Sequence, residues 1–128
     1  MRYLFIFSVF LGLSACAQDK EAAKNNVAPQ EAAQMIEENP EMILLDVRTP
    51  QEFNSGHLAE ARHIDFYADD FANQLEKLDS SKRYVVYCRS GGRSSRAAKM
   101  MREMGFATVS NLEGGILAWQ RAKLPLKK

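Results

Sequence analysis

The sequence predicts an α/β fold, with a small and mainly parallel central sheet that carries helices on both faces. Strand patterns lie at 42–45, 84–88 and 107–112, and the first two are short apolar runs, as in strands buried on both faces. Segments with helical spacing separate these strands, which implies parallel pairing through right-handed crossovers. In such sheets chemistry lies beyond the carboxyl ends of the strands, so Cys88 ends a strand at the expected place.

Two helices are expected in the first half of the domain. One begins at Pro29, because a first helical turn tolerates proline. The other begins with Thr49 as its N-cap, has Pro50 at its first position and is closed by a capping box to Glu52. The apolar residues that follow Pro29 with helical spacing are Ala32, Ala33, Met35 and Ile36.

Three helices are expected in the second half. The first begins at about Asp69, the second spans 94–104 with Gly105 as its C-terminal cap, and the last spans 116–123 after two glycines. The first two have a clear apolar face, which would pack against the sheet. These faces consist of Phe71, Leu75 and Leu78, and of Ala97, Ala98, Met101 and Met104.

The amino-terminal segment 1–15 is interpreted as a targeting signal rather than as part of the fold. Arg2 supplies a positive charge, an apolar run follows, and small residues lead into Cys16. The run of roughly 11 apolar residues is shorter than the about 20 that span a membrane. A buried amino-terminal helix is the alternative. Residues 16–27 are largely polar and small, and predict a flexible tether before a domain at 28–128.

The segment Leu13-Ser14-Ala15-Cys16 resembles the lipobox of bacterial lipoproteins. The resemblance implies that Cys16 becomes the first residue of the mature protein, carries lipid and anchors the protein to a membrane. Acyl chains contribute about 0.8 kcal/mol per buried CH₂ group, so several of them hold a small domain firmly. The expected location is therefore the bacterial cell envelope. With Ala17 after the cysteine, the outer membrane is favoured, on its periplasmic face or at the surface.

The charge balance gives no sign of a nucleic-acid partner. The full chain has a net charge of +1, and removal of the signal segment takes away Arg2 and leaves equal numbers of basic and acidic residues. The two cysteines then have different roles. If Cys16 carries lipid, Cys88 is an unpaired thiol in an oxidising compartment. The alternative is a disulfide between Cys16 and Cys88.

The loop after the second strand concentrates features that activate a thiol. Its two glycines allow a tight turn with amide groups pointing inward, and the following helix adds the positive end of its dipole. Two arginines add positive charge, so the pKa of the cysteine should be depressed and the loop could hold an anion. A small buried hydrophobic residue is the alternative reading of the cysteine. The loop reads Cys88-Arg89-Ser90-Gly91-Gly92-Arg93-Ser94.

This loop resembles the active-site loop of single-domain rhodaneses, a family of sulfurtransferases. Two flanking motifs are similar to the amino-terminal and carboxyl-terminal signatures of that family, and the three together cover nearly all of the domain. The resemblance implies a rhodanese-like fold. The flanking motifs are Leu45-Asp46-Val47-Arg48 with Glu52-Phe53 and Gly56-His57-Leu58, and Leu112-Glu113-Gly114-Gly115 with Ala118-Trp119.

The resemblance also implies a two-step sulfur transfer with Cys88 as the catalytic nucleophile. The thiolate takes a sulfane sulfur from a donor such as thiosulfate, and the resulting persulfide passes it to cyanide, a thiol or a cysteine of a partner protein. The amides of 89–94 would stabilise the persulfide, and no metal or organic cofactor is implied. Thiosulfate-preferring tandem rhodaneses carry a lysine where Ser90 stands, so anion binding would fall to Arg89 or Arg93.

Two alternatives to an enzyme use the same cysteine. One is a non-enzymatic persulfide carrier or binding module presented at the membrane. The other is a redox-sensing thiol, which would form a sulfenate or mixed disulfide at Cys88. A cysteine phosphatase is disfavoured, because its Cys-x5-Arg loop needs an arginine where Ser94 stands. Arg93 comes one residue too early and Arg96 two residues too late.

Several polar residues outside the loop are interpreted as structural. His57 and His63 lack further spaced ligands and are a poor signal for a metal site. Asp46, Arg48 and Glu52 are expected to form an ion-pair and capping set, although Asp46 ends a strand close to the loop.

Overall fold

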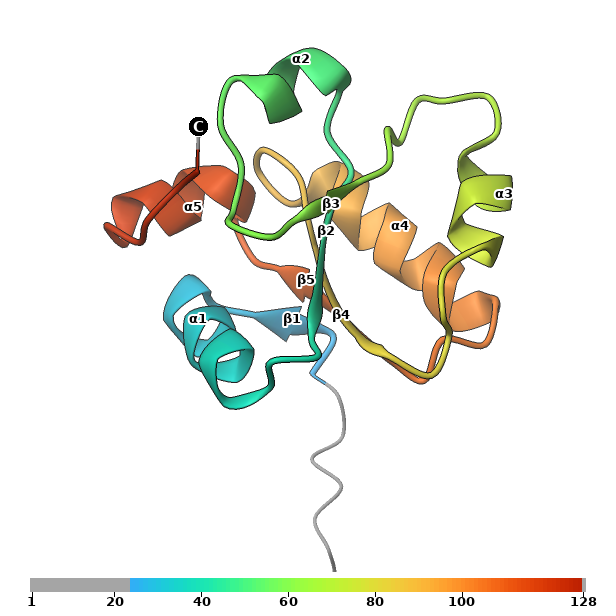
Figure 1. Cartoon of the computed structure of the whole chain (residues 1–128), viewed down its shortest axis with the longest axis horizontal. Coiled ribbons are helices and arrows are strands. Elements are labelled where there is room, and N and C mark those ends of the chain that lie inside the picture. Colours follow the sequence, from blue (N-terminus) through green and yellow to red (C-terminus); the bar gives the residue numbers. More distant parts are fainter. Residues whose placement is uncertain (1–23, 128) are drawn as a thin grey trace, which may run out of the picture.

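The computed structural model describes residues 24–127 of the chain. The signal segment, Cys16 and most of the tether expected at 16–27 lie outside the described residues. Strands and helices alternate along the whole domain. In chain order the elements are β1 (Asn26–Val27), α1 (Pro29–Glu38), β2 (Ile43–Asp46), α2 (Pro50–Asn54), β3 (Arg62–His63), α3 (Phe71–Glu76), β4 (Arg83–Tyr87), α4 (Gly92–Glu103), β5 (Thr108–Leu112) and α5 (Gly115–Arg121), as labelled in Figure 1.

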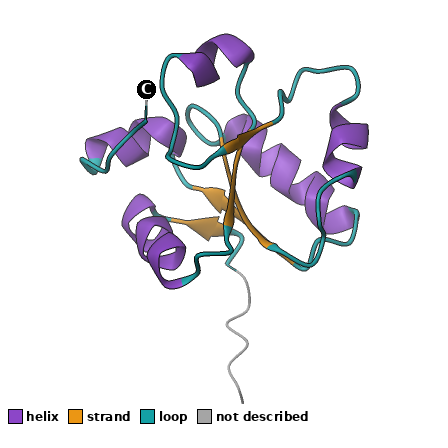
Figure 2. Cartoon of the chain, in the orientation of Figure 1, coloured by secondary structure: helices purple, strands orange, loops and turns teal. Residues whose placement is uncertain are grey.

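The five strands form one sheet in the order β1-β5-β4-β2-β3, and every neighbouring pair is parallel (Figure 2). The central strand β4 pairs with β2 on one side and with β5 on the other. Asp46 at the end of β2 lies opposite Tyr87 at the end of β4, so both strands finish at the same edge. The predicted α/β class with a parallel sheet is confirmed.

Helices cover both faces of this sheet (Figure 1). α1 and α5 pack on one face, α3 and α4 pack on the other, and α2 lies beyond the carboxyl end of β2. Side chains of the central strand alternate between the two layers. Tyr84 and Val86 face α3 and α4, and Cys88 continues this series, whereas Val85 and Tyr87 face α1 and α5. Burial on both faces explains why the strand reads as a continuous apolar run.

The two short strands β1 and β3 are not predicted by the sequence. Each contains two residues, too few for an alternating pattern to be recognised. β1 also corrects the end of the tether predicted at 16–27. Val27 is buried and pairs with Leu112 of β5, and the Asn111 amide donates to the Asn25 carbonyl at 2.8 Å. The folded part of the chain therefore begins before residue 28.

The start of α2 follows the predicted capping residues, whereas the start of α4 differs from the prediction. The Glu52 amide donates to Thr49 Oγ1 at 3.3 Å, and the Thr49 amide donates to the Glu52 carboxylate at 3.3 Å, so the capping box forms as expected. α4 begins at Gly92, two residues before the expected start at Ser94. Gly91 takes the N-cap position with φ of +108°, a left-handed conformation that favours glycine.

The predicted ion pair between Asp46 and Arg48 is present and buried. The Arg48 guanidinium donates to the Asp46 carboxylate at 2.7 to 3.0 Å and to the Gly56 carbonyl at 2.6 Å. Both side chains are almost completely buried, with exposed fractions of 5% for Arg48 and 0% for Asp46. These bonds connect the end of β2 to the turn that follows α2, and so hold α2 over the carboxyl edge of the sheet.

Candidate active site

Cys88 follows the last residue of β4, at the carboxyl edge of the sheet, as expected from the sequence. It is a free cysteine. Its side chain is 1% exposed and joins the apolar cluster between the sheet and the helices α3 and α4. Arg89 and Ser90, the next two residues, are exposed. The sulfur therefore lies just below the surface, enclosed by its own loop.

The loop directs hydrogen-bond donors at this sulfur. The Gly91 amide donates to Cys88 Sγ at 3.1 Å, and the Ser94 hydroxyl lies 3.3 Å from the same atom. Gly91 reaches this position through its left-handed backbone, and Ser94 reaches it because α4 begins at Gly92 and turns its first residues toward the end of β4. The predicted cradle of inward-facing donors is thus formed.

Burial and hydrogen bonding act on the Cys88 thiol in opposite directions. Burial raises its pKa, but hydrogen bonds from the Ser94 hydroxyl and from the amides of Ser94, Gly91 and Ser90 lower it more, so the net pKa is below the usual value. A lowered pKa was expected from the sequence, in part from the charges of Arg89 and Arg93. The stabilisation of the thiolate instead comes mainly from hydrogen bonds.

Arg93 does not stand free as the expected anion-binding cation. Its guanidinium donates two hydrogen bonds to the Glu52 carboxylate of α2, at 2.8 and 3.0 Å. The hydrogen bonds from Arg93 outweigh partial burial and, with those from Thr49, lower the pKa of Glu52 to about 2. The sequence predicted a capping role for Glu52 but not this partner. Arg93 also lies 5.7 Å from the ring centre of Tyr67. Most of its charge is therefore committed within the protein.

The start of α5 supports the loop from behind. The Ile116 amide donates to the Cys88 carbonyl at 2.9 Å, and the Leu117 amide donates to the Arg89 carbonyl at 3.2 Å. This approach requires Gly115, which has φ of +62°, because a Cβ atom there would lie 2.4 Å from the Arg89 carbonyl oxygen. The glycine pair of the carboxyl-terminal motif thus allows a helix to pack directly on the backbone of Cys88.

A buried polar chain behind the sulfur was missed by the sequence analysis. Ser94 Oγ donates to Asn111 Oδ1 at 2.6 Å, and Asn111 Nδ2 donates to Asn26 Oδ1 at 3.1 Å. Ser94 and Asn111 are buried, whereas Asn26 is exposed at the sheet edge. A polar Ser-Asn pair inside the strand pattern at 107–112 was the available signal, because a buried polar side chain needs a partner.

The histidines have structural partners, as interpreted from the sequence. Both rings stack on Phe53, with centroid distances of 4.0 Å for His57 and 4.7 Å for His63. The rings also donate to the backbone carbonyls of Phe53, at 3.1 Å, and of Arg48, at 2.7 Å. Within residues 24–127, no group of three or more His, Cys, Asp or Glu residues could hold a metal ion. Among the described helices, none has the length and apolarity needed to cross a membrane.

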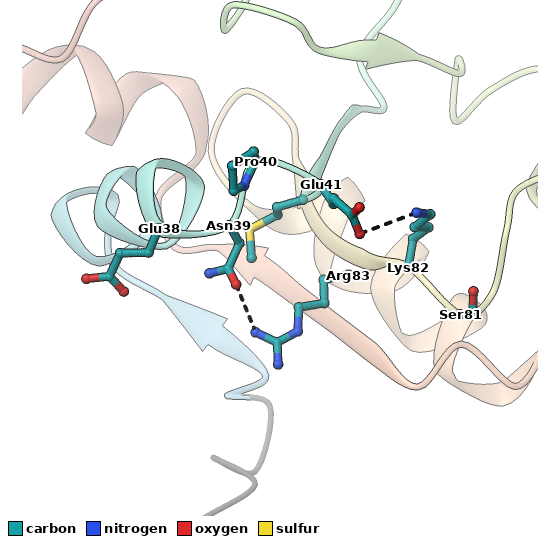
Figure 3. A pocket seen from close by; sticks show the side chains of 8 residues that line it. Glu38, Asn39, Pro40, Glu41, Ser81, Lys82 and Arg83 are labelled. Atoms are coloured by element: carbon teal, nitrogen blue, oxygen red, sulfur yellow. Dashed lines mark hydrogen bonds and ion pairs between the residues drawn. The ribbon is translucent and has the colours of Figure 1, made fainter.

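A cavity of about 300 Å³ is lined by residues just before and at the start of β2 and β4 (Figure 3), at the edge of the sheet opposite the end that carries Cys88. It opens where β2 and β4 begin and is lined by charged and polar residues of both signs. Several of these side chains already pair with one another: Arg83 with Asn39, and Lys82 with Glu41, each at 3.5 Å. This cavity therefore has no part in the chemistry of the cysteine loop.

Comparison with known proteins agrees with this architecture. Residues 28–122 match the model of the rhodanese-like domain family, and the chain belongs to this family. A relative in Bacillus subtilis, described as a putative sulfurtransferase, YtwF, is 42% identical over 90 residues, covering 70% of this chain and 84% of the relative. The thiosulfate sulfurtransferase GlpE of Pseudomonas aeruginosa is 34% identical over 94 residues, covering 73% and 82%.

The solved structures that resemble the chain include a rhodanese-related protein from Thermoplasma volcanium. It has a TM-score of 0.72 and 25% identity, covering 80% of this chain and 97% of that one. The rhodanese-like domain of Alr3790 from Anabaena also has a TM-score of 0.72, with 26% identity and coverage of 81% and 79%. The protein is thus a rhodanese-like domain whose relatives include sulfurtransferases, as the three sequence motifs implied.

Proposed function

We propose that the protein is a sulfurtransferase that carries sulfur as a persulfide on Cys88. In the first step, the Cys88 thiolate attacks the outer sulfur of a donor such as thiosulfate. A new S–S bond forms to Cys88, the S–S bond of the donor breaks, and sulfite leaves with the bonding electron pair. In the second step, cyanide or a thiolate attacks the terminal sulfur, and Cys88 leaves as a thiolate. No net oxidation occurs, and no cofactor is required.

The observation that carries this proposal is the enclosure of one sulfur by hydrogen-bond donors. The Gly91 amide and the Ser94 hydroxyl both lie within 3.3 Å of Cys88 Sγ. Donors in this arrangement favour the thiolate that attacks in the first step, and they also favour Cys88 as the leaving group in the second. The sulfurtransferase names of the relatives in Bacillus and Pseudomonas support the same reaction class.

The sulfur donor is proposed to be an anion, because an arginine stands next to Cys88. Because Arg93 is paired with Glu52, the exposed Arg89 next to Cys88 is the side chain that we expect to attract an anionic donor. One relative is described as a thiosulfate sulfurtransferase, which makes thiosulfate the first donor to test. The acceptor is proposed to be a small thiol, cyanide or the cysteine of a partner protein.

The decisive experiment is intact-mass analysis of a Cys16→Ala variant, in which Cys88 is the remaining cysteine. After incubation with thiosulfate, we expect a gain of one sulfur atom, and no gain when Cys88→Ser is added. Repeated formation of thiocyanate from cyanide identifies an enzyme. A single sulfur that leaves only to a protein thiol identifies a carrier. Oxygen or a mixed disulfide in place of sulfur would identify a redox sensor and overturn the proposal.

We further propose that lipid on Cys16 tethers the domain to a membrane of the bacterial cell envelope. This proposal rests on the sequence at 13–16, which resembles a lipobox. These residues lie outside the described structure. The expected form is an outer-membrane lipoprotein with a tether after Cys16. Fractionation of cells that express the wild type and Cys16→Ala tests this proposal. Release of the variant into the soluble fraction supports the anchor, and unchanged membrane association excludes it.

A further inference from the structure

Four side chains form a single polar chain that begins at the reactive sulfur and ends at the edge of the sheet. Cys88 Sγ lies 3.3 Å from Ser94 Oγ, which lies 2.6 Å from Asn111 Oδ1. Asn111 Nδ2 donates to Asn26 Oδ1 at 3.1 Å. Asn26 and Asn111 are directly opposite each other in the pairing of β1 with β5. The geometry of this pairing thus connects the first strand of the domain to Cys88.

The Ser94 hydroxyl has two possible acceptors but one proton. It can donate to the Cys88 sulfur or to the Asn111 carbonyl oxygen, and the contact with Asn111 is the shorter by far. While the proton points at Asn111, Ser94 Oγ offers lone pairs to Cys88, which suits a thiol that donates S–H. While the proton points at the sulfur, Ser94 stabilises a thiolate. Each of the two directions of the Ser94 hydroxyl therefore stabilises a different charge state of Cys88, the neutral thiol or the thiolate.

An asparagine can serve both directions because its amide presents an acceptor on one side and donors on the other. With its oxygen toward Ser94, it takes the hydroxyl proton away from the sulfur. After a half-turn, its nitrogen donates to Ser94 Oγ and leaves that proton free for the sulfur. Asn26, the partner of Asn111, is exposed and carries an amide too, so the two amides can turn together. An aspartate at either position would accept only.

We propose that Asn111 is a positioning residue for Cys88, and that its amide, with Asn26 behind it, sets the direction of the Ser94 hydroxyl. This role rests on the proposed function of Cys88 as the reacting sulfur. Asn111 touches neither sulfur nor substrate in the proposed reaction, and acts through Ser94. A consequence is that β1, the first strand of the domain, influences the reactivity of a sulfur two strands away.

The charged side chains near Cys88 lie outside β1 and β5, the strands that carry Asn26 and Asn111. The substitutions in the test below therefore leave these charges unchanged. The charge of Arg93 in α4 acts on the thiol, and this side chain is paired with Glu52 of α2 and lies over the Tyr67 ring. Arg89 follows Cys88 in the loop and is exposed. Neither arginine is hydrogen-bonded to Asn26 or Asn111.

The experiment measures the rate of Cys88 alkylation by iodoacetamide against pH, in a Cys16→Ala chain without any sulfur donor. Asn26→Asp should hold the Asn111 oxygen toward Ser94, because a carboxylate accepts from Asn111 Nδ2 and cannot donate. We expect the alkylation pKa to rise, with a rate at neutral pH that falls about tenfold or more, as for one hydrogen bond lost to an ion. Asn111→Asp should act in the same direction and more strongly.

Three matched variants separate this mechanism from charge or folding. Asn25→Asp places the same charge on the exposed neighbour of Asn26, and should leave the profile unchanged. Ser110→Ala removes a hydrogen bond to the Lys24 carbonyl at the same sheet edge, and should also leave it unchanged. In a Ser94→Ala chain, Asn26→Asp should have no effect.

Equal profiles for Asn26→Asp and Asn25→Asp in folded protein would overturn the proposal, as would an Asn26→Asp effect that persists without the Ser94 hydroxyl. If Asn111→Asp does not fold, the exposed position 26 decides alone. Since no donor is present, these results are independent of persulfide formation. If the wild type gains no sulfur from thiosulfate, the proposed function is refuted. The alkylation experiment would still test the role of Asn111 independently.

Discussion

The Arg93 guanidinium and the Glu52 carboxylate face each other through two hydrogen bonds, at 2.8 and 3.0 Å, although they lie 41 residues apart in the chain. Glu52 also closes the capping box of α2 with Thr49. One carboxylate therefore fixes the first turn of α2 and the first turn of α4, on either side of the carboxyl edge of the sheet. The loop that encloses Cys88 is held between these two helix starts.

This ion pair makes stability depend on pH in an acidic range. The folded-state pKa of Glu52 is about 2, against 4.5 for an unperturbed glutamate, so the stabilisation is present above pH 4.5 and lost as pH falls toward 2. Glu52→Gln keeps a capping side chain but removes the charge. We expect a loss of about 0.5–1 kcal/mol near neutral pH, because the pair is partly exposed. Urea unfolding at a series of pH values should show the two proteins converging below pH 4.5. A constant difference at all pH values would contradict this account.

The buried pair of Asp46 and Arg48 should be far more sensitive than a surface pair. Asp46→Ala leaves the Arg48 charge buried without its carboxylate, and should lower the free energy of unfolding by about 3–5 kcal/mol. The matched control is Glu103→Ala, which breaks an exposed pair with Lys99 and should cost less than about 0.5 kcal/mol. Denaturant melts of both variants provide the comparison. A similarly small loss of unfolding free energy in both variants would show that burial of the Asp46–Arg48 pair does not affect stability.

Two glycines of the site should respond in opposite ways to the same substitution. Gly115→Ala places a methyl group against the Arg89 and Cys88 backbone and also strains a left-handed residue, so α5 must shift away from the loop. We expect the free energy of unfolding to fall by at least about 2 kcal/mol. The rate of Cys88 alkylation should also change from that of the wild type. Gly92→Ala has open space and should be neutral or stabilise α4 by about 0.5–1 kcal/mol. Thermal melts and alkylation kinetics would check both, and equal tolerance at the two positions would refute the packing argument.

The central elements could be predicted from the sequence because their signals are local. The apolar run at 84–88 indicates a strand buried on both faces, and Thr49, Pro50 and Glu52 together specify a helix start. The position of Cys88 followed from the alternation of strands and helices alone. Each of these inferences depends on residues that are neighbours in the chain, so no knowledge of the tertiary structure was needed.

The remaining features depend on contacts between distant segments. The two-residue strand at Asn26 forms because it pairs with the edge of β5. No local sequence pattern predicts this pairing. The arginines of the loop indicated positive charge, but the pairing of Arg93 with Glu52 is decided by how α2 sits over the sheet. In the same way, Asn111 read as an ordinary strand residue, although its side chain faces the first turn of α4 and bonds to Ser94.

The 1% exposure of Cys88 also works as a steric filter on what can react with it. A donor that delivers one sulfur at the tip of a slender molecule needs little movement of the loop at 88–94. A mixed disulfide with a bulky cellular thiol would need room for a whole side chain beside the sulfur that accepts from the Gly91 amide. In the oxidising compartment that we propose for it, the thiol would thereby be shielded from large disulfides by the seven residues of its own loop.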